Sequence, residues 1–77
     1  MAVQGATPIG HAAVRPQWSC SCGAGRWPCP TARTLLLLTI DRLDLAQHAA
    51  GWVYDAARDL PDATPAELFD RFLHWTR

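Results

Sequence analysis

Apolar residues recur at helical spacing in three successive segments between about residue 32 and the end of the chain. The first segment runs from about Ala32 to Leu43, contains four consecutive leucines and follows Thr31, which can cap a helix. Its length and the flanking Ala-Arg pair favour a helix over a short buried strand. Because apolar side chains surround most of its axis, we expect this helix to be buried on most sides.

The second segment, Leu45–Leu60, carries the clearest apolar stripe, and Asp44 precedes it as a cap. The stripe consists of Leu45, Ala49, Trp52, Val53, Ala56 and Leu60. Asp55 and Asp59 share another face, where we expect a solvated acidic surface. If residues 41–44 do not interrupt the chain, the first two segments instead form one long bent helix.

The third segment has the clearest local signal for a helix start. Thr64 is placed as the N-cap, Pro65 as the first helical residue, and Glu67 as the partner of Thr64 in a capping box. The helix is predicted from Pro65 to about Trp75, with Glu67 and Arg71 forming an ion pair one helical turn apart.

The first part of the chain shows neither helical nor strand periodicity. Residues 1–10 are small and polar, which predicts a flexible N-terminal tail. From Pro16 to Pro30 the chain is dense in Pro, Gly, Ser and Cys, which predicts an irregular loop. We therefore predict a mainly α protein: a small zinc-stapled irregular N-terminal loop followed by two or three packed helices, with residues 11–77 as a single domain. A chain of 77 residues has a marginal hydrophobic core, so a bound metal ion that cross-links the loop would add stability that the core lacks.

The residues for a staple are the three cysteines Cys20, Cys22 and Cys29, which lie within ten positions. Thiolates at this spacing can converge on one zinc ion, which takes four ligands in a tetrahedron. Gly23 and Gly25 permit the left-handed backbone that a tight turn around a metal needs. Cys29 directly precedes the leucine-rich helix, where negative charge is favoured.

The fourth ligand is predicted to be His11, which lies nine residues before Cys20 on the same segment. His48 and His74 are alternatives, since either could reach the cysteines through folding. Three other interpretations stay open: an iron–sulfur cluster, free thiols without a metal, and catalysis with Cys20 or Cys22 as nucleophile.

Two tryptophans, Trp18 and Trp27, flank the cysteines. Their large apolar side chains favour an aromatic core against the helices over a cover for the metal.

Charge is unevenly distributed, although the formal net charge is zero. Residues 1–40 carry three arginines and no acid, whereas residues 41–77 carry seven acids and four arginines. Arg15, Arg26 and Arg33 could form an anion-binding face, but we favour arginines that are solvated or paired with acids such as Asp41 and Asp44. Without a basic excess, nucleic acid is not the favoured partner.

The leucine run is much shorter than a membrane span, and the N-terminus lacks the pattern of a secretory signal. We therefore expect a cytoplasmic protein without membrane contact. In a reducing compartment, clustered cysteines are more typical of metal binding than of disulfides.

The chain resembles a group of short uncharacterised actinobacterial proteins, over about residues 11–77. That group has a His followed by W-x-C-x-x-C-G-x-x-W-P-C-x-x-A-R, which Trp18, Cys20, Trp27–Cys29 and Ala32-Arg33 match. Its helical tail ends in a P-A-E-L-x-x-R-F-L-x-W motif, matched from Pro65 to Trp75. The resemblance implies a compact metal-bearing helical protein, often encoded beside biosynthetic genes.

This chain departs from the group's pattern at Cys22, which follows Cys20 after one residue instead of two. Some members carry a flavin-reductase label. The residues here do not support that label, because there is no phosphate-cradling glycine loop after a strand and no set of strands for a flavin-binding barrel.

The favoured function is that of a structural-zinc accessory or adaptor protein that binds another protein in a biosynthetic or regulatory setting. Exposed apolar surface around Trp52, Phe72 and Trp75 would provide the contact. The alternatives are a nucleic-acid-binding regulatory zinc protein and a flavin or thiol redox component. An enzyme is less favoured, and a homo-oligomer is compatible with the sequence.

Overall fold

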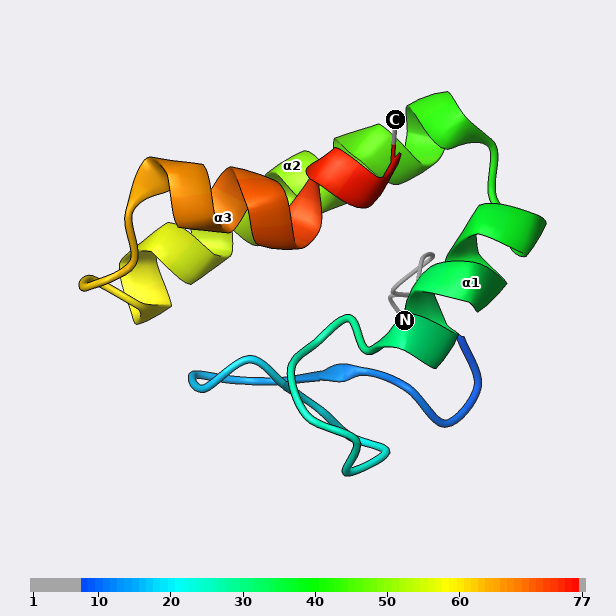
Figure 1. Cartoon of the computed structure of the whole chain (residues 1–77), viewed down its shortest axis with the longest axis horizontal. Coiled ribbons are helices and arrows are strands. Elements are labelled where there is room, and N and C mark those ends of the chain that lie inside the picture. Colours follow the sequence, from blue (N-terminus) through cyan, green and yellow to red (C-terminus); the bar gives the residue numbers. More distant parts are fainter. Residues whose placement is uncertain (1–7, 77) are drawn as a thin grey trace.

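The computed structural model describes residues 8–76 and is mainly helical, as predicted (Figure 1). Two short strands, β1 (Ala13–Val14) and β2 (Ser19–Cys20), form an antiparallel pair. Three helices follow, namely α1 (Pro30–Thr39), α2 (Arg42–Asp59) and α3 (Pro65–Phe72), and then a 3-10 turn at His74–Thr76. Most of the predicted flexible tail, residues 1–7, lies outside the described residues.

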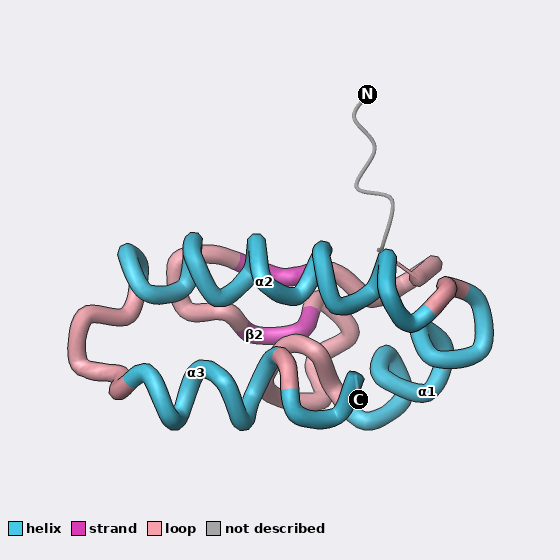
Figure 2. The backbone as a smooth tube through the Cα atoms, turned by 90° about the horizontal axis from the view of Figure 1, so that it is seen from above, coloured by secondary structure: helices cyan, strands magenta, loops and turns pink. Residues whose placement is uncertain are grey.

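The helices α2 and α3 lie side by side and run in opposite directions, joined by a short turn (Figure 2). Helix α1 lies at one end of this pair. The N-terminal loop, by which we mean residues 11–29 with the two strands, lies against one side of the helices (Figure 1). Its side chains meet those of α2 and α3 in a single core.

Helix α1 begins earlier than predicted and has a different cap. The Sγ of Cys29 accepts a hydrogen bond from the N–H of Ala32 at 3.4 Å, so Cys29 is the N-cap instead of Thr31. Pro30 then takes the first helical position, where its missing N–H costs nothing. The cap residue is therefore one of the three cysteines.

The break between α1 and α2 also lies earlier than predicted. The backbone of Ile40 is extended and ends α1, so the alternative prediction of a single long bent helix is wrong. The carboxylate of Asp41 accepts from the N–H groups of Leu43 at 3.0 Å and Asp44 at 3.4 Å. Asp41 is thus the cap of α2, and Asp44 lies in its first turn, where a negative charge is favourable.

The leucine run is less buried than predicted. Leu36 is only 1% exposed, but Leu38 is 76% exposed and Leu43 is 68% exposed. Helix α1 packs against the rest of the chain on one side, so the leucines on its other side face solvent. The expectation of burial on most sides is therefore wrong.

The core is built on aromatic side chains from the loop and the helices. Trp18 and Trp27 are both buried, which confirms the predicted aromatic core. Trp18 meets Phe72 edge-on at a centroid distance of 5.3 Å, and Trp27 meets Trp52 at 5.4 Å. Such edge-on pairs stabilise a core beyond the area they bury. The predicted stripe of α2 is also confirmed, since its residues are buried or partly buried: Leu45, Ala49, Trp52, Val53, Ala56 and Leu60.

The capping box at the start of α3 is confirmed, but the predicted Glu67–Arg71 ion pair is not formed. Glu67 Oε1 accepts from the N–H of Thr64 at 2.7 Å, and Thr64 Oγ1 accepts from the N–H of Glu67 at 3.1 Å. Arg71 turns toward the N-terminal loop, where its guanidinium donates to the backbone carbonyls of Trp27 and Trp18. Arg71 thereby ties α3 to the loop.

Asp59 ties the loop to α2 from the other side. Its carboxylate accepts from Arg15 Nε at 2.6 Å, from Arg15 Nη2 at 3.2 Å and from Trp18 Nε1 at 2.8 Å. The predicted solvated acidic surface is therefore wrong for Asp59, and Arg15 pairs with it instead of with Asp41 or Asp44. Hydrogen bonds from Arg15 and Trp18 lower the pKa of Asp59 below its usual 3.8.

We predict that Asp59→Asn lowers the melting temperature at pH 7. Because the pKa of Asp59 is lowered in the folded chain, its stabilising effect is complete above the unfolded pKa of about 3.9. This effect is lost as the pH falls through the folded pKa. The difference between wild type and variant, followed by circular dichroism, should therefore shrink in acid.

The matched control is Asp62→Asn, which removes an exposed carboxylate from the turn after α2. Its melting temperature should follow that of the wild type at every pH. Equal melting temperatures of Asp59→Asn and wild type at pH 7 would contradict the anchoring role.

Candidate metal centre

The four predicted ligand residues come from three separate parts of the loop. His11 follows a turn closed by a hydrogen bond from its own N–H to the carbonyl of Pro8, at 3.1 Å. Cys20 ends β2, and Cys22 lies in the turn after it. Cys29 is the N-cap of α1.

Strand pairing brings His11 beside the first two cysteines. Ala13 pairs with Cys20 in the antiparallel register, and the N–H of Ser21 donates to the carbonyl of Ala12 at 2.8 Å. Ser21 Oγ accepts from the N–H of Ala12 at 2.9 Å, which closes the pair. His11 directly precedes these residues, so the short hairpin determines its position.

A tight turn then returns the chain toward Cys29. The N–H of Gly23 donates to the carbonyl of Cys20 at 3.0 Å, and the N–H of Cys20 donates to the carbonyl of Gly25 at 2.6 Å. Both glycines have positive φ, 86° at Gly23 and 122° at Gly25, a region that side chains rarely allow. The predicted left-handed backbone is therefore confirmed.

The ligand atoms of the four residues gather in one small volume. His11 Nδ1 lies 3.5 Å from Cys20 Sγ and 3.4 Å from Cys29 Sγ, and Cys22 Sγ lies 3.8 Å from Cys29 Sγ. All four atoms lie within 4.8 Å of one another, so the group could hold a metal ion. Cys20 and Cys29 are buried, His11 is half-buried and Cys22 is exposed.

Three of the six separations agree with those of a tetrahedral site for a single ion, and all six are within 4.8 Å. Ligands at about 2.3 Å for sulfur and about 2.0 Å for nitrogen, arranged as a tetrahedron, have sulfurs roughly 3.8 Å apart and sulfur–nitrogen pairs roughly 3.5 Å apart. The three measured distances agree with these values. The backbone thus places the ligand atoms at metal-binding separations.

The two alternative histidines lie elsewhere. His48 is exposed on α2. His74 follows α3, where its Nδ1 lies 3.2 Å from Asp70 Oδ1 and its ring stacks on Phe69. Among the described residues, the structure brings only His11 of the three histidines to the cysteines.

The local environment favours thiolate at Cys20. Burial raises the pKa of the Cys20 thiol, but hydrogen bonds from the backbone N–H of Cys22, from His11 and from the neighbouring thiols outweigh it. The resulting pKa is about 6. At Cys22 the backbone N–H of Ala24 lowers the pKa, but the interactions with Cys20 and Cys29 and the burial of the thiol together outweigh it, and the pKa is raised overall. One thiol of the group is therefore ready to bind a metal near neutral pH.

Cys29 has a second stabilising contact. Its Sγ accepts the N–H of Ala32 in the first turn of α1, where unpaired N–H groups and the helix dipole favour negative charge. The same residue therefore caps a helix and contributes a ligand atom to the candidate metal centre.

Two residues that position the loop, Asp59 and Arg71, could not be assigned that role from the sequence. Asp59 belongs to an acidic helix face, which predicted a solvated carboxylate. Arg71 lies one helical turn from Glu67, which predicted an ion pair between them. Their partners, Trp18 and Trp27, are 41 to 53 residues away in the chain. Only the tertiary fold brings them together.

Comparisons with protein families, curated proteins and solved structures find no match for this chain. Across residues 8–76, none of the helices combines the length and the apolar composition required to cross a bilayer. The functional argument therefore depends on the site itself.

We predict that His11→Ala weakens the binding of Co²⁺, a spectroscopic substitute for a tetrahedral metal, by more than about a hundredfold. Losing a direct ligand should exceed the 10- to 100-fold effect typical of losing a residue that only orients one. Competition with a coloured chelator measures the affinity, and the intensity of the visible absorption reports tetrahedral geometry.

The control is His48→Ala, which removes an exposed imidazole from α2 and should leave Co²⁺ affinity unchanged. If His48→Ala or His74→Ala weakens binding and His11→Ala does not, the fourth ligand has been assigned to the wrong histidine.

Proposed function

We propose that this chain is a small zinc-stapled accessory protein that acts by binding another protein. The observation that carries the proposal is the group formed by His11, Cys20, Cys22 and Cys29, whose ligand atoms lie within 4.8 Å of one another. Three thiolates and one imidazole complete a zinc tetrahedron with no position left for water or substrate. Such a closed site supports a structural role over a catalytic one.

The ligand set favours zinc over the other metals. Thiolate and imidazole ligands in a tetrahedron are typical of Zn²⁺, whereas hard cations take oxygen. An iron–sulfur cluster would distribute its ligands over more than one iron and spread them further apart. The short separations of the ligand atoms therefore support a single zinc ion.

The zinc ion would hold the loop closed against the helices. It would join the segment before β1, the end of β2 and the start of α1, because its ligands come from these places. Between them the loop carries Trp18 and Trp27 into the core. In so small a chain, the free energy of metal binding would contribute directly to folding.

The protein-binding part of the proposal is supported by exposed leucines. Leu37 and Leu38 lie in the last part of α1 and Leu43 lies in the first turn of α2, and all three are exposed. These leucines lie on either side of the turn between α1 and α2, and a contiguous exposed apolar patch is typical of a contact surface. We call these three residues the leucine surface.

The leucine surface replaces the contact residues expected from the sequence. Phe72 is fully buried, and Trp52 and Trp75 are partly buried against the core. They are therefore committed to the fold and do not provide the exposed apolar area that we expected around them.

Thiol chemistry is a second candidate, supported by one observation. Cys22 is exposed beside Cys20, whose pKa is lowered to about 6 in the metal-free chain. A chain that lost its metal would therefore present a reactive thiolate next to an accessible thiol. Rapid alkylation of the chain as purified, with its metal present, would favour this role over the structural one.

The cellular setting belongs to the proposal as well. Three free thiols are suited to a reducing compartment such as the cytoplasm, where they would stay available to zinc. The resemblance to actinobacterial proteins encoded beside biosynthetic genes suggests an accessory role in biosynthesis or its regulation.

We predict one zinc ion per chain in native mass spectrometry. Removal of zinc with a chelator should release the loop and reduce the helical signal in circular dichroism, and adding zinc back should restore it. A chain that is metal-free as purified, with its full helical signal and three accessible thiols, would contradict the zinc staple.

We also predict that the double variant Leu38→Asp, Leu43→Asp keeps its zinc and its helices but loses its protein partner. Both side chains are exposed, so their replacement should not disturb the core. The measurement is quantitative mass spectrometry of the proteins that co-purify with the tagged chain from its own cells.

The matched control is Gln47→Asp, Ala57→Asp, which adds the same charge at exposed positions of α2. It should retain the partner. If both double variants retain the same proteins, the leucine surface is not the binding site.

A further inference from the structure

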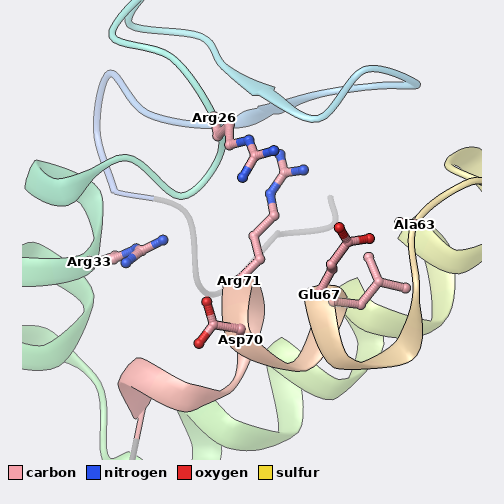
Figure 3. Close-up of a pocket in the computed structure, with 7 residues that line it drawn as sticks. Arg26, Arg33, Ala63, Glu67, Asp70 and Arg71 are labelled. Atoms are coloured by element: carbon pink, nitrogen blue, oxygen red, sulfur yellow. The ribbon is translucent and has the colours of Figure 1, made fainter.

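A pocket of about 230 Å³ lies between the N-terminal loop, α1 and α3. Its charged lining residues are Arg26, Arg33, Arg71, Glu67 and Asp70 (Figure 3). Each arginine comes from a different part of the fold, Arg26 from the loop, Arg33 from α1 and Arg71 from α3. We call this site the arginine pocket. None of its lining residues belongs to the candidate metal centre.

Two hydrogen bonds hold the guanidinium of Arg71 in place and leave its other N–H groups available to a ligand. Its Nε donates to the carbonyl of Trp27 at 3.1 Å, and its Nη2 donates to the carbonyl of Trp18. These acceptors are neutral, and among residues 8–76 no carboxylate forms an ion pair with Arg71. A guanidinium has five N–H groups, so three of them have no protein acceptor in the described part of the chain.

The other two arginines are also without a neutralising partner in the described residues. Arg33 Nε donates to the carbonyl of Pro28 at 3.1 Å, and its guanidinium lies 5.6 Å from the ring centre of Trp75. Arg26 is exposed, and within residues 8–76 its side chain has neither a hydrogen bond nor an ion pair. Figure 3 shows the guanidinium groups of Arg26 and Arg71 converging and Arg33 directed toward the same space.

The acids of the pocket are engaged with other partners. Glu67 Oε1 accepts from the N–H of Thr64 in the capping box, and Asp70 Oδ1 lies 3.2 Å from His74 Nδ1. Three positive and two negative side chains therefore leave one positive charge in excess. Burial, and after it the positive charges of Arg26 and Arg33, lower the pKa of Arg71.

We propose that the arginine pocket binds the phosphate group of a ligand. Guanidinium groups present rigid paired donors that match the oxygens of a phosphate, and three of them approach this pocket from different sides. A tetrahedral phosphate offers oxygens in several directions, whereas a planar carboxylate offers them in one plane. A bound phosphate would also neutralise the charges that repel one another here.

The sequence suggested a different set of arginines for an anion. Arg15 belonged to that set, but its guanidinium is occupied by Asp59 and lies 3.8 Å from Asp55. Arg71 takes its place, because α3 packs against the loop beside Arg26. The pocket does not depend on the leucine surface or on the identity of the metal.

The experiment is a titration of the full chain, purified with its metal and labelled with nitrogen-15, with inorganic phosphate at constant ionic strength. The arginine Nε–Hε signals of Arg26, Arg33 and Arg71 should shift together and saturate. Arg26→Gln should weaken phosphate binding by about tenfold, the loss of one charged hydrogen bond. Since Arg26 is exposed, the variant should keep its fold.

The control variant is Arg58→Gln, which removes the same charge from an exposed position of α2 and should leave the phosphate affinity unchanged. Arg33→Gln provides a second test at the pocket. Equal phosphate binding by wild type, Arg26→Gln and Arg33→Gln would overturn the proposal, as would the absence of any saturable shift.

Two further titrations identify the chemistry of the ligand. Acetate should bind more weakly than phosphate, and acetate binding of equal strength that requires Arg26 would overturn the assignment to phosphate. A short oligonucleotide that requires Arg26 and binds more tightly than inorganic phosphate would support the proposal and assign the phosphate to nucleic acid. Weaker oligonucleotide binding would support a small phosphorylated ligand.

Discussion

The convergence of one imidazole and three thiols within 4.8 Å is the constraint on which the rest of this structure depends. The N-terminal loop has only two short strands, so its backbone alone holds it weakly. Yet the loop supplies Trp18 and Trp27, two of the largest side chains in the core. The tryptophans can be buried only while the loop stays closed, and the four ligand residues lie where they could close it.

Two charged side chains support the same loop from the helices. Asp59 of α2 accepts hydrogen bonds from Arg15 and Trp18, and Arg71 of α3 donates to the carbonyls of Trp18 and Trp27. Asp59 provides a partner for the indole N–H of Trp18 and Arg71 one for the carbonyl of Trp27, while the carbonyl of Trp18 also accepts from the N–H of Trp27. These contacts join the loop to both helices of the antiparallel pair and add to the constraint at the four ligand residues.

This arrangement produces three candidate binding sites that differ in polarity and charge. The candidate metal centre is compact and partly buried, which suits a bound metal ion. The leucine surface is apolar and exposed, which suits another protein. The arginine pocket has one positive charge in excess and none of its arginines forms an ion pair within residues 8–76, which suits an anion. Because these proposals rest on separate residues, each can fail without the others.

The sequence by itself determined the helical class, the stripe of α2, the capping box of α3 and the cluster of three cysteines at the candidate metal centre. These features depend on short-range periodicity, cap chemistry and cysteine spacing, which are local properties of the chain. The tertiary structure alone decided that Cys29 caps α1, that the leucine run is exposed on one side, and that His11 lies with the cysteines while His48 and His74 do not. It also decided the partners of Asp59 and Arg71, because these lie more than 40 residues away and no local pattern encodes a contact at that separation.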